Sequence, residues 1–266
     1  MICLNLFSQV DVVIPSCEKD LLTLDLAIDS IRKNGVDVGN IYVISEYKLS
    51  EKAYWINEKA FPFSRENIKK HFCNKKNEDQ TDERIASRIG WYHQQLLKLY
   101  AHKVILGLSE NFLILDSDTI FLRKTEFVTP DGTIWLNIGK KRSVLAPYVS
   151  HLKKILPTFQ FATFPVSGIS HHMVFNKTIL DELFLEIEAR FNKQFWEIYL
   201  CAIKPEHYLH SGASEYEIFF YYSLIKFPER VCLRSLNWID ISDLRDLQKL
   251  IDLYDFVSCH SYMRVL

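Results

Sequence analysis

Apolar and polar positions follow two different periods in the opening part of the chain. The run at 11–15 (DVVIP) is β-branched and ends in a proline, which is typical of a strand that leads into a loop. Leucine and isoleucine then recur at helical spacing over 21–35, where Asn34 and Gly35 form a helix stop. A second strand pattern follows at 40–46 (NIYVISE). Because parallel strands need a crossover helix between them, this opening predicts a parallel sheet.

The same two periods predict further elements along the rest of the chain. The predicted helices cover 91–105, 177–203 and 214–226, and the predicted strands cover 111–122, 132–139, 170–176 and 254–263. Charged residues crowd the segment 65–88, which we expect to be a solvated polar loop or mobile flap within the domain. No internal repeat interrupts the pattern, so the simplest account is a single α/β domain over residues 1–266.

The composition excludes some classes of partner. Hydrophobic residues make up 48% of the chain, charged residues make up 24%, and the formal net charge is -1. Such a balance gives no bulk attraction to nucleic acid or to an anionic membrane. Six cysteines without a CxxC pair argue against a zinc site or a disulfide framework and favour a reducing compartment.

The N-terminal residues do not have the pattern of a secretory signal. They lack a basic segment, and Ser8, Gln9 and Asp11 soon interrupt their apolar character. No apolar run approaches the ~20 residues that a membrane-spanning helix needs. We therefore expect a cytoplasmic protein without a transmembrane segment.

The most informative segment is 111–123 (NFLILDSDTIFLR). Its lead-in is apolar on both faces, which places the strand in the middle of a covered parallel sheet. Asp116 and Asp118 follow at the carboxyl end of that strand, where such sheets bind ligands. If the chain stays extended through Ser117, both carboxylates point the same way and repel unless a cation lies between them. Mg²⁺ or Mn²⁺ is the natural partner of such oxygens, and the alternative is a turn cap beside a solvated acid.

The motif resembles that of a known class of enzymes. A DxD after a buried strand, behind a strand–helix–strand unit, is similar to the GT-A glycosyltransferases. It fits haloacid dehalogenase-type phosphatases less well, because they have Thr or Val where Ile120 stands. The segments GWYHQQLLKL, LILDSDTIFL, SGISHHMVF and SEYEIF, in that order, resemble the bacterial DUF6492-type glycosyltransferase family.

The resemblance carries expectations about fold and chemistry. It implies a GT-A-like (Rossmann-like) fold, with a mixed, mostly parallel sheet flanked by helices. It implies a nucleotide-sugar donor (a UDP- or GDP-sugar), a glycan or lipid-linked acceptor, and Mn²⁺ or Mg²⁺ held on the diphosphate. In GT-A enzymes the loop after the first strand receives the nucleoside, which makes Ser16, Lys19 and Asp20 candidates, against the alternative of an ordinary turn. A late histidine often adds a metal ligand, so His260 joins the two aspartates, unless it is merely a solvated terminal residue.

Acid/base candidates come from the segment SGASEYEIF. Glu215 is similar in position to the acceptor-side carboxylate of inverting GT-A enzymes, which takes the proton from the attacking hydroxyl. Glu217 is the second candidate. With Ser214 it also fits a capping box, in which each side chain satisfies a free N–H of the first helical turn.

Three further side chains are candidates for substrate contact. On the helix predicted after Gly90, Gln95 and Lys98 share one stripe with Trp91, and they could reach the nucleotide or sugar hydroxyls, although a solvated face is the alternative. His171 and His172 stand at the head of a predicted strand, where one faces the pocket and the other packs. We take His172 as the substrate contact and a buried histidine as its alternative.

These candidates together predict a metal-dependent glycosyltransferase. One rival is a phosphatase or nucleotidyltransferase that uses the same aspartates, and another is a non-catalytic carbohydrate-binding protein. A lipid-linked acceptor reached from the cytosol would require only peripheral contact with a membrane.

Overall fold

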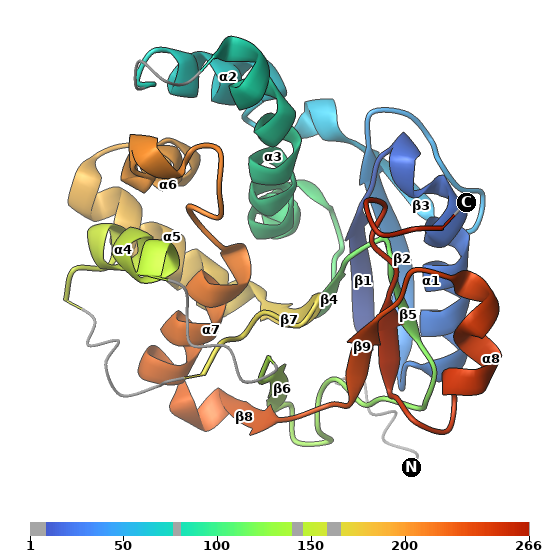
Figure 1. Ribbon diagram of the computed structural model, residues 1–266. Coiled ribbons are helices and arrows are strands. Elements are labelled where there is room, and N and C mark those ends of the chain that lie inside the picture. Colours follow the sequence, from blue (N-terminus) through green and yellow to red (C-terminus); the bar gives the residue numbers. More distant parts are fainter. Residues whose placement is uncertain (1–8, 77–80, 140–145, 159–165, 266) are drawn as a thin grey trace.

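A five-stranded sheet forms the centre of the computed structural model, which describes residues 9–76, 81–139, 146–158 and 166–265 (Figure 1). Its strand order is β3-β2-β1-β4-β7, and all neighbours are parallel except the antiparallel pair β4 and β7. The predicted mixed, mostly parallel sheet is therefore confirmed. Its strands are β1 (Val10–Pro15), β2 (Val38–Ser45), β3 (Tyr54–Asn57), β4 (Asn111–Leu115) and β7 (His172–Asn176).

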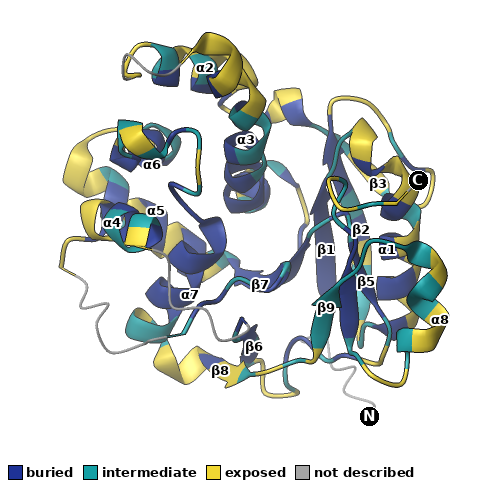
Figure 2. Ribbon diagram, viewed as in Figure 1, coloured by how far each residue is buried: buried dark blue, intermediate teal, exposed yellow. Residues whose placement is uncertain are grey.

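The middle strands are buried on both faces, as their continuous apolar sequences require (Figure 2). The exception in β1 is Asp11, a buried carboxylate. It accepts hydrogen bonds from the backbone N–H groups of Asn40 and Ser109 at 2.7 and 2.8 Å, which compensates its burial. Asp11 thereby fixes the starts of β2 and β4 beside β1.

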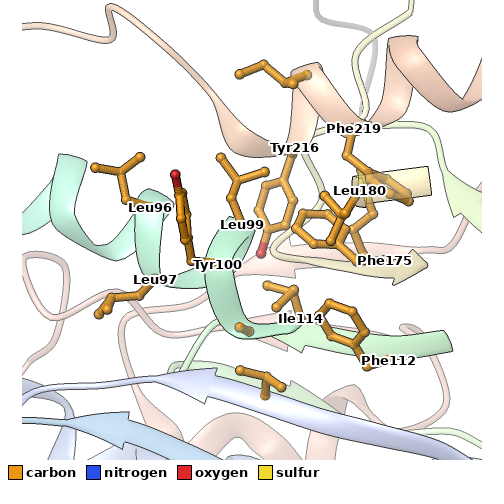
Figure 3. Close-up of a cluster of buried hydrophobic side chains, with 14 of the residues drawn as sticks. Leu96, Leu97, Leu99, Tyr100, Phe112, Ile114, Phe175, Leu180, Tyr216 and Phe219 are labelled. Carbon is orange, nitrogen blue, oxygen red and sulfur yellow. The ribbon is translucent and has the colours of Figure 1, made fainter. Parts of the chain in front are cut away.

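Helices cover both faces of the sheet (Figure 1). Helix α1 (Leu21–Asn34) connects β1 to β2, while α3 (Asp82–Val104) and α7 (Glu215–Lys226) pack on the opposite side. In Figure 3, Leu99 of α3 and Tyr216 of α7 lie beside Ile114 of β4 and Phe175 of β7. This apolar packing sets α3 and α7 over the carboxyl end of β4, where the two aspartates follow.

The segment predicted as a polar loop is largely helical, so that prediction was wrong. Helix α2 (Arg65–Cys73) begins at a capping box formed by Ser64 and Asn67, and its Ile68 and Phe72 are fully buried. Two apolar side chains at i and i+4 are enough to anchor a short, highly charged helix. Residues 74–75 form a turn, residues 77–80 lie outside the described ranges, and α3 begins at Asp82 after its N-cap, Thr81.

The long helix predicted over 177–203 is in fact two helices, α5 (Lys177–Phe191) and α6 (Phe195–Ala202). They separate at Asn192, which adopts a left-handed backbone conformation with φ 51° and so ends α5. Both α5 and α6 bury apolar residues at helical spacing, which explains why the periodicity did not show the break between them. The described residues also form the α-helices α4 (Ala146–Ile155) and α8 (Leu247–Leu250).

Two small sheets complete the fold. A three-stranded sheet has the order β5-β10-β9, in which β10 is antiparallel to β5 and parallel to β9. A parallel pair joins β6 and β8. The strands are β5 (Thr119–Phe121), β6 (Ile134–Asn137), β8 (Val231–Arg234), β9 (Trp238–Asp240) and β10 (Phe256–Ser258). The first of these sheets brings the end of the chain next to the aspartate motif.

No helix in the described part of the chain is both long enough and apolar enough to cross a membrane. The five cysteines within that part are all free thiols.

Candidate active site

A cavity of about 670 Å³ opens at the carboxyl ends of β1 and β4, between α3, α7 and the three-stranded sheet. Among the described residues that line it, six carboxyl groups stand against the two lysines Lys19 and Lys98 and the two histidines His171 and His260. Such a lining repels anions unless a cation is bound with them. The carboxyl groups belong to Asp20, Asp116, Asp118, Glu215, Glu217 and Asp240.

The two aspartates of the motif diverge, because the chain turns between them. Strand β4 ends at Leu115, and the backbone N–H of Thr119 donates to the carbonyl of Asp116 at 3.0 Å. The chain therefore does not stay extended through Ser117, and the condition under which both carboxylates would point the same way is not met. Each one enters a different cluster of charges.

Asp116 belongs to a buried ion cluster centred on Lys98. The Lys98 Nζ lies 2.6 Å from Asp116 Oδ1 and 2.6 Å from Glu215 Oε1. Burial opposes the charge of Lys98, but the two carboxylates outweigh it and hold the lysine pKa well above its ordinary value. The Tyr216 hydroxyl donates to Asp116 at 3.2 Å, and His171 Nδ1 lies 3.6 Å from the other carboxylate oxygen. Asp116 therefore has partners on both oxygens.

Asp118 belongs to a second cluster, which strand pairing assembles. Thr119 pairs with Ser258 of β10, and Ser258 pairs with Asp240 of β9. This register sets His260 between two carboxylates: its Nδ1 is 2.8 Å from Asp118 Oδ2, and its Nε2 is 3.4 Å from Asp240 Oδ1. Residues from three distant parts of the sequence thus meet beside the cavity.

The second cluster fits a divalent cation. One possible ligand atom each from His171, Asp240 and His260 lies within 4.8 Å of the others. Asp118 Oδ1 is buried without a hydrogen-bond partner in the described structure, so one carboxylate oxygen is uncommitted. Burial opposes the charge of His260, but hydrogen bonds to Asp118 and Asp240 raise its pKa to about 10. The ring is therefore protonated at neutral pH when no cation is bound, and a cation would have to displace that proton. Carboxylate oxygens and neutral imidazole nitrogens suit Mn²⁺.

Glu217 is a buried carboxyl group with a pKa close to neutrality. Burial raises its pKa to about 7, although hydrogen bonds from the Ser167 hydroxyl at 2.5 Å and the Gly168 N–H at 3.2 Å oppose the change. Ser214 caps α7 by accepting from the Glu217 N–H at 3.3 Å, which is one half of the expected capping box. The Glu217 carboxylate contacts the 167–168 segment instead and lines the cavity.

The first loop contributes Lys19 and Asp20 to the lining, whereas Ser16 is not part of it. Asp20 accepts from Ser117 at 3.1 Å and from Arg264 at 3.2 Å. Burial, together with the nearby charge of Asp118, raises the pKa of Asp20. The loop is therefore fastened both to the aspartate motif and to the C-terminal segment.

Of the two adjacent histidines, His171 lines the cavity and His172 does not. The His172 ring packs edge-on against Phe121 and Phe256, and burial lowers its pKa to about 3. Its environment is that of a core histidine, which is the alternative noted above for this residue. Gln95 and Lys98 both line the cavity, as the predicted polar stripe requires.

Sequence reasoning missed Asp240 and assigned no role to His171. Asp240 ends a three-residue strand that has no recognisable pattern, and only its pairing with β10 brings it to the site. His171 adopts a left-handed conformation with φ 61°, which turns the chain just before β7. Unusual backbone of this kind often marks a functional position, but it cannot be read from sequence.

Fold and cavity together define an α/β protein with an acidic ligand site at the carboxyl ends of a mostly parallel sheet. The chain belongs to the DUF6492 family, described as a family of unknown function, whose profile matches residues 8–240. The structure is similar to the apo form of mouse xyloside xylosyltransferase 1, with 12% identity and a TM-score of 0.46 over 97% of this chain and 100% of that chain. It is also similar to a glycosyltransferase involved in the glycosylation of the major capsid of PBCV-1, with 13% identity and a TM-score of 0.38 over 94% of this chain and 91% of that chain. No curated protein sequence matches the chain.

Proposed function

We propose that the protein is a metal-dependent glycosyltransferase of the GT-A type. It would move a sugar from a nucleotide-sugar donor, a UDP- or GDP-sugar, to a glycan or lipid-linked acceptor. The observation that carries this proposal is the uncommitted buried oxygen of Asp118 in a cavity lined by six carboxyl groups and two lysines. A lining of that charge can accept an anionic diphosphate only together with a cation.

Mn²⁺ or Mg²⁺ would be held by His171, Asp240 and His260, together with Asp118, which contacts His260. A cation bound there supplies positive charge to the leaving nucleoside diphosphate. Lys19 also lines the cavity and adds a second positive charge on the side of the first loop. The nucleoside would then lie along that loop, where Asp20 is held by Ser117 and Arg264.

Glu217 is our candidate for the base if the reaction inverts the anomeric configuration. A base must accept a proton near neutral pH, and burial places the pKa of Glu217 at about 7. Glu215 already accepts a hydrogen bond from Lys98, so taking a proton would compete with a buried ion pair. We assign a structural role to Glu215, Asp116 and Lys98, whose ion pairs hold α3, α7 and the end of β4 together at the cavity.

Thermal unfolding in the presence of UDP or GDP, with and without Mn²⁺, tests the proposal. One nucleoside diphosphate should stabilise the protein only when Mn²⁺ is present, by about 2.7 kcal/mol at a hundredfold excess over Kd. The absence of any metal-dependent stabilisation by either nucleotide would contradict the proposal. Release of free phosphate from phosphate esters, without nucleoside diphosphate from sugar nucleotides, would favour a phosphatase instead.

A further inference from the structure

One face of α3 lines the cavity with both charged and neutral side chains. Trp91, Gln94, Gln95 and Lys98 of this helix all line the cavity. Lys98 marks the charged half, and Trp91 lies seven residues earlier, roughly 10 Å along the helix axis. Trp91, Gln94 and Gln95 carry no charge, and we call the part of the cavity that they line the neutral half.

Gln95 presents an unsatisfied donor in this neutral half. The side chain is only 2% exposed, and its Oε1 accepts a hydrogen bond from the Tyr199 hydroxyl. Its Nε2 is buried and has no hydrogen-bond partner in the described part of the chain. An unpaired buried donor costs about 1–3 kcal/mol, so the fold tolerates a penalty that a ligand oxygen would remove.

Tyr199 determines which end of the Gln95 amide remains available. Burial raises the pKa of Tyr199 well above its ordinary value, so the hydroxyl keeps its proton and acts as a donor. Its position is fixed on the other side by His151, whose ring packs edge-on at 4.8 Å and whose Nε2 donates to the Tyr199 carbonyl at 2.9 Å. A donor aimed at the amide oxygen leaves the amide nitrogen for the ligand.

Trp91 supplies an apolar surface next to that donor. The Arg88 guanidinium lies 4.5 Å from the centre of the Trp91 ring and also donates to the carbonyl of His210 at 3.3 Å, which holds the indole in place. A planar apolar surface beside a single amide donor matches a ring that has C–H groups on its face and oxygens on its edge.

We propose that the neutral half of the cavity binds an uncharged sugar ring, which stacks on Trp91 while Gln95 Nε2 donates to one of its oxygens. Tyr199 is the positioning residue that orients Gln95. The inference rests on the proposed function only in that the ligand is a sugar. The ring belongs either to the acceptor or to the sugar moiety of the donor, and the two share the same chemistry.

Binding measurements with Gln95→Leu, Gln95→Glu and Tyr199→Phe test the inference. For the acceptor, the probe is a panel of methyl glycosides titrated in the presence of Mn²⁺ and the stabilising nucleoside diphosphate. For the donor, the probe is the affinity of the corresponding sugar nucleotide relative to the nucleoside diphosphate alone. We expect Gln95→Leu and Gln95→Glu to lower sugar affinity about tenfold in one of the two series, and Tyr199→Phe to lower it about threefold.

The matched control is Tyr222→Phe, which also removes a hydroxyl from a buried tyrosine. The Tyr222 hydroxyl donates to Glu186 at 3.2 Å, and the residue is not part of the cavity lining. This variant should bind both series as the wild type does. A loss in the glycoside series assigns the ring to the acceptor, and a loss in the sugar-nucleotide series assigns it to the donor.

Two results would overturn the inference. One is a wild-type protein that binds no glycoside and gains nothing from the sugar of the donor. The other is a set of folded Gln95 variants with unchanged affinity in both series. Metal-dependent binding of the nucleoside diphosphate would persist in either case if the proposed function is right, so the two failures are distinguishable.

Discussion

The two aspartates of one motif stand in clusters that have opposite electrostatic character. Around Asp116, the buried Lys98 forms ion pairs with two carboxylates, and both oxygens of Asp116 have partners. Around Asp118, two carboxylates share a histidine, and one Asp118 oxygen is left without a partner in the described structure. The first cluster is closed by the protein itself, whereas we propose that a cation completes the second.

This difference shows why the spacing of a motif does not fix the roles of its residues. A turn at Ser117 separates the two side chains, and the elements packed against each one then decide its chemistry. Helix α3 brings Lys98 to Asp116, and strand β10 leads His260 to Asp118. The predictions below test each cluster in turn.

The largest effect should follow Lys98→Met, which breaks the closed cluster. The substitution leaves Asp116 and Glu215 buried without their cation, and removing one partner of a buried ion pair costs about 3–5 kcal/mol. Urea unfolding should show this loss. Lys103→Met on the same helix is the control, because Lys103 is exposed and its pairing with Asp181 is worth at most about 1 kcal/mol.

A triple variant sharpens the same test. Lys98→Met combined with Asp116→Asn and Glu215→Gln removes the unpaired charges, so most of the lost stability should return. A single variant as stable as the wild type would mean that Lys98 does not close this cluster.

Glu217 should give the next largest effect, as a dependence of stability on pH. Its pKa is raised from 4.5 to about 7 by burial, with the like charge of Glu215 adding to the effect. The folded state therefore binds its proton more tightly than the unfolded state, and this stabilisation is complete below pH 4.5 and lost as the pH rises to 7. At about 1.4 kcal/mol per pKa unit, the wild type should lose roughly 3 kcal/mol relative to Glu217→Gln across this range.

Unfolding free energies of both proteins at pH 4.5, 5.5, 6.5 and 7.5 measure this difference. Glu229→Gln is the control, since Glu229 is exposed and its replacement should leave the pH dependence unchanged. A difference between wild type and Glu217→Gln that stays constant over the range would show that Glu217 titrates normally.

The sequence predicted the parts of the site that follow local patterns. A buried strand followed by DxD located the carboxyl end of β4, and helical spacing placed Gln95 and Lys98 on the face of α3 that lines the cavity. Hydrophobic periodicity depends only on neighbours along the chain, so it can be recognised without knowledge of the tertiary structure. The central sheet was predictable for the same reason.

Contacts between distant segments were not predictable in this way. Asp240 reaches the site only through the pairing of β9 with β10, and the cluster around Asp116 depends on how α3 and α7 pack. The charged segment of α2 was misassigned because Ile68 and Phe72, its two buried anchors, are sparse among lysines and glutamates. Each failure concerns a tertiary contact that overrides a local pattern.

Asp118→Asn should give the third-largest effect, because it removes the charge of the carboxylate whose uncommitted oxygen lies in the cluster around Asp118. We expect Mn²⁺ affinity, measured by titration in the presence of the stabilising nucleoside diphosphate, to fall at least about 100-fold. Asp116→Asn should have the smaller effect on metal affinity, because Asp116 is engaged by Lys98 and Tyr216. Asp181→Asn, at an exposed position on α5, is the control. Equal losses from Asp116→Asn and Asp118→Asn would abolish the distinction between the two clusters.

The smallest effect on Mn²⁺ affinity should come from Arg264→Gln, which acts indirectly on the cluster around Asp118. Arg264 donates to the carbonyls of Cys259 and Lys19, and to the side chains of Asp20 and Thr23, at distances of 2.8 to 3.2 Å. These bonds fasten the C-terminal segment to the first loop.

Loosening that segment should displace His260 without removing it, so Mn²⁺ affinity should fall about tenfold, in the range of losses from residues that orient metal ligands. Arg245→Gln is the matched control, because Arg245 is exposed and pairs with Asp243 outside the cavity lining. If Arg264→Gln binds Mn²⁺ as the wild type does, the pairing of β10 with β5 and β9 is by itself sufficient to hold His260 between Asp118 and Asp240.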